Sequence, residues 1–167
     1  MRVCNDLKVW VNPALLVEQY PLPRIEDIFV NLAGGKHFSK LDLRKAYHQI
    51  KVTEESKKFL TINTHKGLFH YNRLVLGVSS SPAIWQRAKD QVLQGLPGTQ
   101  CILNDMIASG KTDEVHLENL KSVLKWLQDA GVKANKEKCE FFRDRAQFCR
   151  HEIDREGSPQ DTRRLGQ

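Results

Sequence analysis

The longest regular pattern in the chain is a helical one over residues 112–130. Its leucines recur three or four residues apart, which places them on one stripe of a helix. Asp113 and Glu114 fall in the first turn, where the helix dipole favours negative charge, and Gly131 stands where a helix commonly ends. The sequence therefore predicts an amphipathic helix that packs into a core through Leu117, Leu120, Leu124 and Leu127.

Shorter helical and strand-like runs alternate along the rest of the chain. One helix is expected over residues 24–32 and another over 81–95, which begins with a serine cap and a proline in its first turn. Short turns between the strand-like runs favour antiparallel pairing. We expect an α+β fold, an antiparallel sheet with helices on one face. Its strands are predicted over residues 2–8, 37–43, 47–52, 59–63, 68–71 and 147–153.

Length and charge set broad limits on what the chain does. Its 167 residues suffice for one core, and 26 Lys and Arg against 20 Asp and Glu give a formal net charge of +6. A basic balance favours a polyanionic partner without identifying one. No apolar run is long enough to cross a bilayer, and the start lacks the apolar core of a signal peptide. We therefore expect no membrane partner and an intracellular location, cytoplasmic or nuclear, rather than secretion.

The four cysteines form no CxxC pair, which argues against a disulfide framework or a zinc ribbon. Cys139, Cys149 and His151 are conceivable zinc ligands. Because Cys149 and His151 fall in a strand-like run, structural burial is the simpler interpretation.

Two acidic residues stand at the expected ends of strands. Asp42 lies at the far end of the strand predicted over 37–43, and a polar pair between two apolar runs predicts a hairpin over 101–107 with Asn104 and Asp105 at its tip. If the strands are neighbours, the carboxylates of Asp42 and Asp105 converge and can bind a hard cation. The alternative is a pair of ordinary solvated turn aspartates.

Several motifs resemble one known family. Tyr20-Pro-Leu-Pro-Arg-Ile-Glu-Asp27 and Phe38-Ser-Lys-Leu-Asp-Leu-Arg-Lys-Ala-Tyr-His-Gln-Ile50 resemble the reverse transcriptases of gypsy-type LTR retrotransposon pol polyproteins. The resemblance continues in collinear order to about residue 157. It rests further on Asn63-Thr-His-Lys-Gly-Leu-Phe69, Ser81-Pro-Ala-Ile-Trp-Gln86, Val92-Leu-Gln-Gly95, His116-Leu117 and Asn135-Lys-Glu-Lys-Cys-Glu-Phe-Phe142.

The resemblance implies a reverse-transcriptase palm with partial fingers over residues 1–157, followed by a disordered tail over 158–167. It implies DNA synthesis on an RNA or DNA template-primer duplex from a dNTP, with two Mg²⁺ ions held by carboxylates. Asp42 then matches a metal-binding aspartate and Leu43 supplies a backbone carbonyl to the same metal, while Asp105 matches a second aspartate.

Further positions take roles from the same resemblance. Tyr47 matches the side chain that excludes a ribose 2′-hydroxyl, and Arg2 matches a fingers arginine that contacts the triphosphate. Lys138 matches a lysine proposed as general acid. Tyr47 can alternatively pack under the sheet, and Arg2 and Lys138 can be solvated cations. Leu76 lies in the segment that lines the nucleotide pocket, where the family usually has phenylalanine.

The main departure is in the hairpin, where the family's Tyr-x-Asp-Asp reads Ile102-Leu103-Asn104-Asp105. A neutral amide in place of the first aspartate weakens metal binding and transition-state stabilisation. Arg150 also replaces a glycine that a positive φ would favour. We therefore expect an impaired polymerase fragment, which lacks the thumb and RNase H segments of a pol polyprotein. The alternatives are a non-enzymatic nucleic-acid-binding module and a functionless relic.

Overall fold

The computed structural model describes residues 7, 11–17, 19–93, 95–156 and 160–161. The chain divides into two compact units. The smaller unit comprises Met1–Pro21 and Lys45–Ala88, and the larger unit comprises Leu22–Arg44 and Lys89–Gln167. The strand expected over residues 2–8 lies almost entirely outside the described residues.

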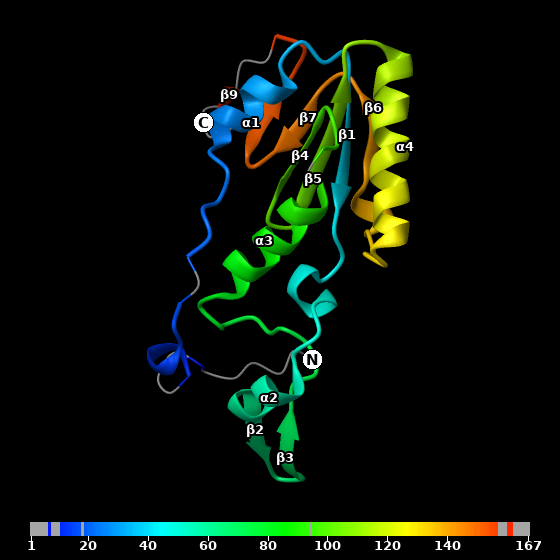
Figure 1. The fold of residues 1–167 in the computed structure, drawn as a ribbon. Coiled ribbons are helices and arrows are strands. Elements are labelled where there is room, and N and C mark those ends of the chain that lie inside the picture. The colour runs from blue at the N-terminus through cyan, green and yellow to red at the C-terminus, as the bar shows by residue number, and fades with distance from the viewer. Residues whose placement is uncertain (1–6, 8–10, 18, 94, 157–159, 162–167) are drawn as a thin grey trace. The chain divides into compact units, whose positions relative to one another are not determined.

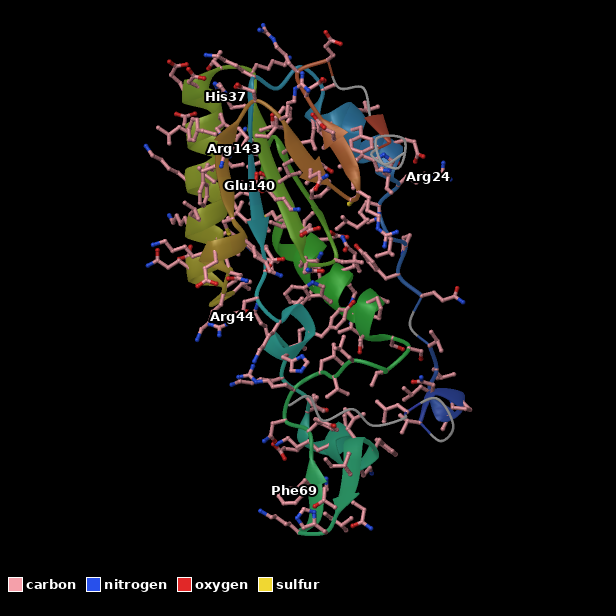
Figure 2. The ribbon with its side chains drawn as sticks, turned by 180° about the vertical axis from the view of Figure 1, so that it is seen from behind. Arg24, His37, Arg44, Phe69, Glu140 and Arg143 are labelled. Carbon is pink, nitrogen blue, oxygen red and sulfur yellow. The ribbon has the colours of Figure 1, made fainter. Side chains whose placement is uncertain are left out.

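The larger unit is built on a four-stranded antiparallel sheet in the order β4-β5-β1-β6 (Figure 1). Each residue of β1 pairs with one of β5, from His37 opposite Gly110 to Asp42 opposite Asp105. Figure 2 shows Glu140 and Arg143 on β6, the edge strand beside β1. The strands are β1 (His37–Asp42), β4 (Thr99–Ile102), β5 (Asp105–Gly110) and β6 (Glu140–Arg143).

Helix α4 (Asp113–Asp129) covers one face of this sheet. The Thr112 side chain caps it by accepting a hydrogen bond from the Val115 amide at 3.3 Å. The buried stripe consists of His116, Asn119, Leu120, Val123 and Leu127. The predicted leucine core is thus half wrong, because Leu117 and Leu124 are 41% and 44% exposed. Each follows a buried residue by one position, which turns it about 100° away from the core.

The opposite face carries a second core. Helix α1 (Ile25–Leu32) buries Ile28, Phe29 and Leu32 against Phe38 of β1 and Ile107 of β5. The antiparallel α+β architecture is confirmed, with the addition that α1 lies on the face opposite α4. This core is completed by Ala146, Phe148 and Ile153 of a small sheet of β7 (Ala146–Phe148), β8 (His151–Ile153) and β9 (Gln160–Asp161).

Residues 147–153 form a hairpin rather than the single strand expected from their alternation. Cys149 and Arg150 are its two-residue turn, with φ of 52° and 67°. Cys149 and His151 therefore do not share a strand face. Gln160 and Asp161 pair with β8 where the sequence predicts a disordered tail, since strand pairing uses the backbone and needs no apolar period. The rest of 158–167 lies outside the described residues.

The described residues of the smaller unit include a β-hairpin, on which Figure 2 shows Phe69. Its core is Leu7, Leu60, Val75 and Val78. The hairpin strands occur one residue or two from their predicted positions, but the strand expected over 47–52 is wrong, because a 3-10 helix begins after Lys45 at φ 49°. The elements are η1 (Asn12–Ala14), η2 (Ala46–Gln49), α2 (Glu54–Lys57), η3 (Lys58–Leu60), β2 (Thr61–Thr64) and β3 (Gly67–His70).

Helix α3 (Ser81–Leu93) starts at the predicted serine and ends two residues before Gly95. Within the described part of the chain, no helix is long and apolar enough to span a membrane.

Candidate active site

The two candidate carboxylates lie side by side in the larger unit. Asp42 ends β1, Asp105 begins β5, and the two residues are direct cross-strand partners. Cross-strand partners point to the same face of a sheet with Cβ atoms roughly 4.5–5.5 Å apart. The arrangement gives two half-buried carboxylates on one face, at one end of the two central strands.

A two-residue turn, Leu103 and Asn104, joins β4 to β5. The turn therefore lies one residue earlier than the predicted tip, and Asp105 is already in the strand. Leu103 adopts a left-handed φ of 50°, and the exposed Asn104 accepts a 2.8 Å hydrogen bond on its carbonyl from the Leu43 amide. This bond ties the turn to the end of β1, so Asn104 stays next to the carboxylate pair.

Several cations surround Asp105. Burial raises the pKa of its carboxyl, Lys40 lowers it, and the nearby Asp42 carboxylate raises it again. The Lys40 Nζ lies 4.0 Å from Asp105 Oδ2, and Lys138 and Lys89 act on the same carboxyl with smaller lowering effects. Two acidic side chains therefore share their surroundings with three basic ones.

Lys138 is the last residue of a 3-10 turn, η4 (Lys136–Lys138), and its side chain is exposed. The Lys138 amide donates to the Asn135 carbonyl at 3.0 Å, and the Asn135 amide donates to the Asp42 carbonyl at 2.7 Å. These two bonds hold the segment that carries Lys138 against the end of β1. The electrostatic effect of Lys138 on Asp105 agrees with that placement.

Lys40 and Lys89 are site residues that our sequence analysis missed. Lys40 is two positions before Asp42 on a strand, so a shared face was available as a signal. Lys89 lies four residues after the buried Trp85 in α3, which places it on the inward stripe of that helix.

Three further predicted residues fall within the described part of the chain. Leu43 is buried beside Asp42 and pairs with Ala134. Tyr47 and Leu76 belong to the smaller unit, where burial raises the pKa of the Tyr47 hydroxyl and Leu76 is 53% exposed. Arg2 lies outside the described residues. The roles of these residues stay predictions.

The donor set suits one hard divalent cation better than two. Mg²⁺ commonly binds one or two carboxylates and completes its shell with water and phosphate oxygens. Asp42 and Asp105 meet that requirement. Among the described residues, no group of three or more His, Cys, Asp and Glu side chains gathers for metal binding, and the neighbouring turn residue Asn104 carries a neutral amide.

Comparison with known proteins gives the family. The family described as "Reverse transcriptase (RNA-dependent DNA polymerase)" matches residues 3–161. The chain is 35% identical to an uncharacterised protein of Caenorhabditis elegans, over 98% of the chain and 13% of that protein. It is 32% identical to the retrovirus-related Pol polyprotein from transposon 412 of Drosophila melanogaster, over 92% of the chain and 13% of the polyprotein.

The Pol polyprotein from the Drosophila melanogaster transposon gypsy is 29% identical over 93% of the chain and 15% of its own length. The chain thus spans about a seventh of these relatives.

Solved structures show the same fold. The foamy viral protease-reverse transcriptase in complex with double-stranded DNA superposes with a TM-score of 0.84 at 23% identity, over 93% of the chain and 27% of that structure. The same viral protein in complex with an RNA/DNA hybrid gives a TM-score of 0.80 at 24% identity, over 87% and 20%. With carboxylates at the ends of two central palm strands and a family match over nearly its whole length, the chain belongs to the reverse transcriptase family of retroelement Pol polyproteins.

Proposed function

We propose that the Asp42–Asp105 pair is the metal centre of a templated DNA polymerase whose activity is impaired by Asn104. The observation that carries the proposal is the register of β1 and β5, which sets Asp42 directly opposite Asp105 with Asn104 in the adjoining turn. Ordinary solvated turn aspartates need no such alignment. The pair also belongs to a chain whose family carries out this chemistry.

In this proposal Asp42, Asp105 and the carbonyl of Leu43 hold Mg²⁺. The metal would lower the pKa of the primer 3′-hydroxyl and neutralise phosphate charge. The exposed Lys138 donates a proton to the departing pyrophosphate, since a general acid must reach the leaving group. In the smaller unit, Tyr47 excludes a ribose 2′-hydroxyl and Leu76 lines the nucleotide pocket. Arg2 contacts the triphosphate.

The cost of Asn104 follows from its charge. An amide offers one neutral carbonyl oxygen, whereas a carboxylate brings a full negative charge to the place where divalent ions and phosphates meet. Loss of one contact that stabilises charge in a transition state commonly costs about 3 kcal/mol, or roughly a hundredfold in rate. The three lysines around Asp105 add positive charge to the same place, which works against metal binding.

We propose an RNA or DNA template-primer duplex and a dNTP as partners. Residues 45–88 of the smaller unit contain seven Lys and Arg but two Asp and Glu, so they account for most of the net charge. A basic surface of this kind binds a phosphate backbone. Related viral structures hold an RNA/DNA hybrid or double-stranded DNA. The thumb and RNase H segments of a longer polyprotein would be further partners.

Primer extension on an RNA template tests this function. The chain, the Asn104→Asp variant and the double variant Asn104→Asp, Asp42→Asn are compared with Mg²⁺ and with Mn²⁺. We expect extension by Asn104→Asp alone, because restoring the carboxylate completes the centre and removing Asp42 destroys it. Robust extension by the unaltered chain would contradict the impairment, and silence of all three would contradict the polymerase proposal for this chain.

A second candidate function is nucleic-acid binding without chemistry. The charge of residues 45–88 favours it independently of the carboxylates. Affinity for a hybrid duplex that falls steeply with salt, together with no extension by Asn104→Asp, would support this candidate. Absence of binding at low salt would exclude it.

A further inference from the structure

Lys89 is a buried lysine beneath the β4–β5 turn. The side chain comes from α3 and the residue is 1% exposed. Its Nζ donates a hydrogen bond to the carbonyl oxygen of Leu103 and lies 3.3 Å from the Sγ of Cys101. Lysine is seldom fully buried unless a specific interaction holds it, because an ammonium loses its hydration there.

The Lys89–Leu103 bond acts on the turn that carries Asn104. Leu103 has the left-handed φ of 50°, and the carbonyl of the next residue, Asn104, is held by the Leu43 amide. The turn is thus fixed from two sides, by Lys89 and by Leu43. A cation placed in this way is fixed against the β4–β5 turn and is not a mobile surface charge.

The groups around Lys89 change the pKa of its ammonium in opposite directions. Burial raises the pKa of the Cys101 thiol to about 11, so at neutral pH this neighbour is an uncharged thiol. Burial lowers the pKa of Lys89, while Cys101, Asp90 and Asp105 act in the opposite direction. Asp105, half of the candidate metal centre, is therefore one of the carboxylates that favour the ammonium form.

We propose that Lys89 is a built-in cation of the Asp42–Asp105 centre that lowers its affinity for divalent metal. A fixed positive charge near Asp105 repels a doubly charged ion and offsets the carboxylate that would bind it. Lys40, at 4.0 Å from Asp105, is half-buried on the same strand pair, whereas Lys89 is fully buried, where solvent screens charge less. Lys89 and Asn104 then weaken the centre together, one by adding positive charge and the other by removing negative charge.

This inference rests on the proposed metal centre, and it is tested by the dissociation constant of Mn²⁺ alone, read from the paramagnetic signal of the free ion. The variants are Lys89→Met, which removes charge and donor, and Lys89→Gln, which removes charge but keeps a donor for Leu103. Lys125→Met, an exposed position on α4, is the matched control. Cooperative thermal unfolding checks that each variant is folded.

We expect Mn²⁺ to bind at least about tenfold more tightly to both Lys89 variants and within about twofold of the original affinity to Lys125→Met. An unchanged or weaker affinity in a folded Lys89→Gln variant would overturn the inference, whatever Lys89→Met does. An equal gain in Lys125→Met would also overturn it, since the effect would then be one of net charge.

Asn104→Asp separates this inference from the proposed function. If Asn104→Asp tightens Mn²⁺ binding and the Lys89 variants do not, the metal centre stands and the role of Lys89 is wrong. If no variant binds Mn²⁺, the carboxylate pair is not a metal centre and both proposals fail.

Discussion

Ser39 and His116 show how single buried polar residues hold the larger unit together. Both are 0% exposed, and the Ser39 Oγ lies 2.8 Å from the His116 Nε2. The Phe142 amide donates to the same Oγ at 3.2 Å, and the rings of His116 and Phe142 meet edge to face at 4.5 Å. This contact joins β1, α4 and β6. Because neither side chain reaches solvent, the pair is structural rather than a serine nucleophile with its base.

The dependence of the unfolding free energy on pH is expected to come in part from the titration of His116. Burial lowers the pKa of His116, His37 lowers it further and Asp113 raises it. A folded-state pKa below the ordinary value near 6.5 gives stability that is present above about pH 6.5 and lost as the pH falls through the folded-state pKa. The unfolding free energy of His116→Leu should therefore fall less steeply than that of the original chain between about pH 7 and pH 5.

Urea unfolding at several pH values measures this slope. His65→Gln is the control, since His65 is exposed on the hairpin of the smaller unit and its replacement should leave the slope unchanged. Equal slopes for His116→Leu and the original chain would contradict the prediction.

The site residues differ in how far the sequence could reveal them. Asp42 and Asp105 could be predicted from the sequence because each stands where a polar residue interrupts an apolar strand pattern. For Lys89 the spacing from Trp85 was the one signal, and it was outweighed because a lysine in an amphipathic helix is ordinarily placed on the solvent side. The groups that Lys89 meets depend on the hairpin that α3 contacts. The cross-strand register of Asp42 and Asp105 likewise depends on pairing between distant segments.

At the scale of elements, local signals decided which predictions were correct. Helix α4 was predicted within one residue at each end because Thr112 caps it and its acidic residues and terminal glycine agree. Residues 47–52 were mistaken for a strand because Tyr47, Ile50 and Val52 favour strands, whereas the left-handed Lys45 turns the chain into η2. The alternation of polar and apolar residues over 147–153 correctly indicated strand structure. The turn within it went unnoticed because Cys149-Arg150 contains no glycine or asparagine to mark a turn.

The turn between β7 and β8 should be improved by glycine. Both turn residues have positive φ, the geometry of a type I′ turn, and an L side chain in the left-handed region costs roughly 1 kcal/mol. We expect Arg150→Gly to raise the unfolding free energy by about 0.5–1 kcal/mol.

Denaturant unfolding checks this value. Arg155→Gly is the control, because Arg155 is exposed in a turn without positive φ, and glycine there should lower stability by a few tenths of a kcal/mol. A loss of stability in Arg150→Gly equal to that in Arg155→Gly would show that the left-handed conformation at Arg150 is not strained.

At the scale of the whole molecule, charge is distributed unequally between the two units. The net charge is concentrated in residues 45–88, while the larger unit holds the carboxylate pair. We expect Lys58→Glu combined with Lys66→Glu to weaken binding of an RNA/DNA hybrid by at least about tenfold and to make the dependence of affinity on salt shallower. Both lysines are exposed in the smaller unit.

Fluorescence anisotropy over a range of salt concentrations measures both effects. Lys121→Glu combined with Lys125→Glu, on the exposed side of α4, makes the same change in net charge in the larger unit. If the Lys121 and Lys125 pair weakens binding as much as the Lys58 and Lys66 pair, nucleic acid does not bind through residues 45–88 in particular.

The rate of a single nucleotide addition most directly tests whether Asn104 limits this polymerase centre. It is measured under single-turnover conditions on an RNA template with Mg²⁺, for the original chain and for Asn104→Asp. We predict that Asn104→Asp adds the nucleotide at least about a hundredfold faster, since it restores a carboxylate beside Asp42 and Asp105. Equal rates in the two proteins would contradict the assignment of this hairpin as the disabled part of the centre.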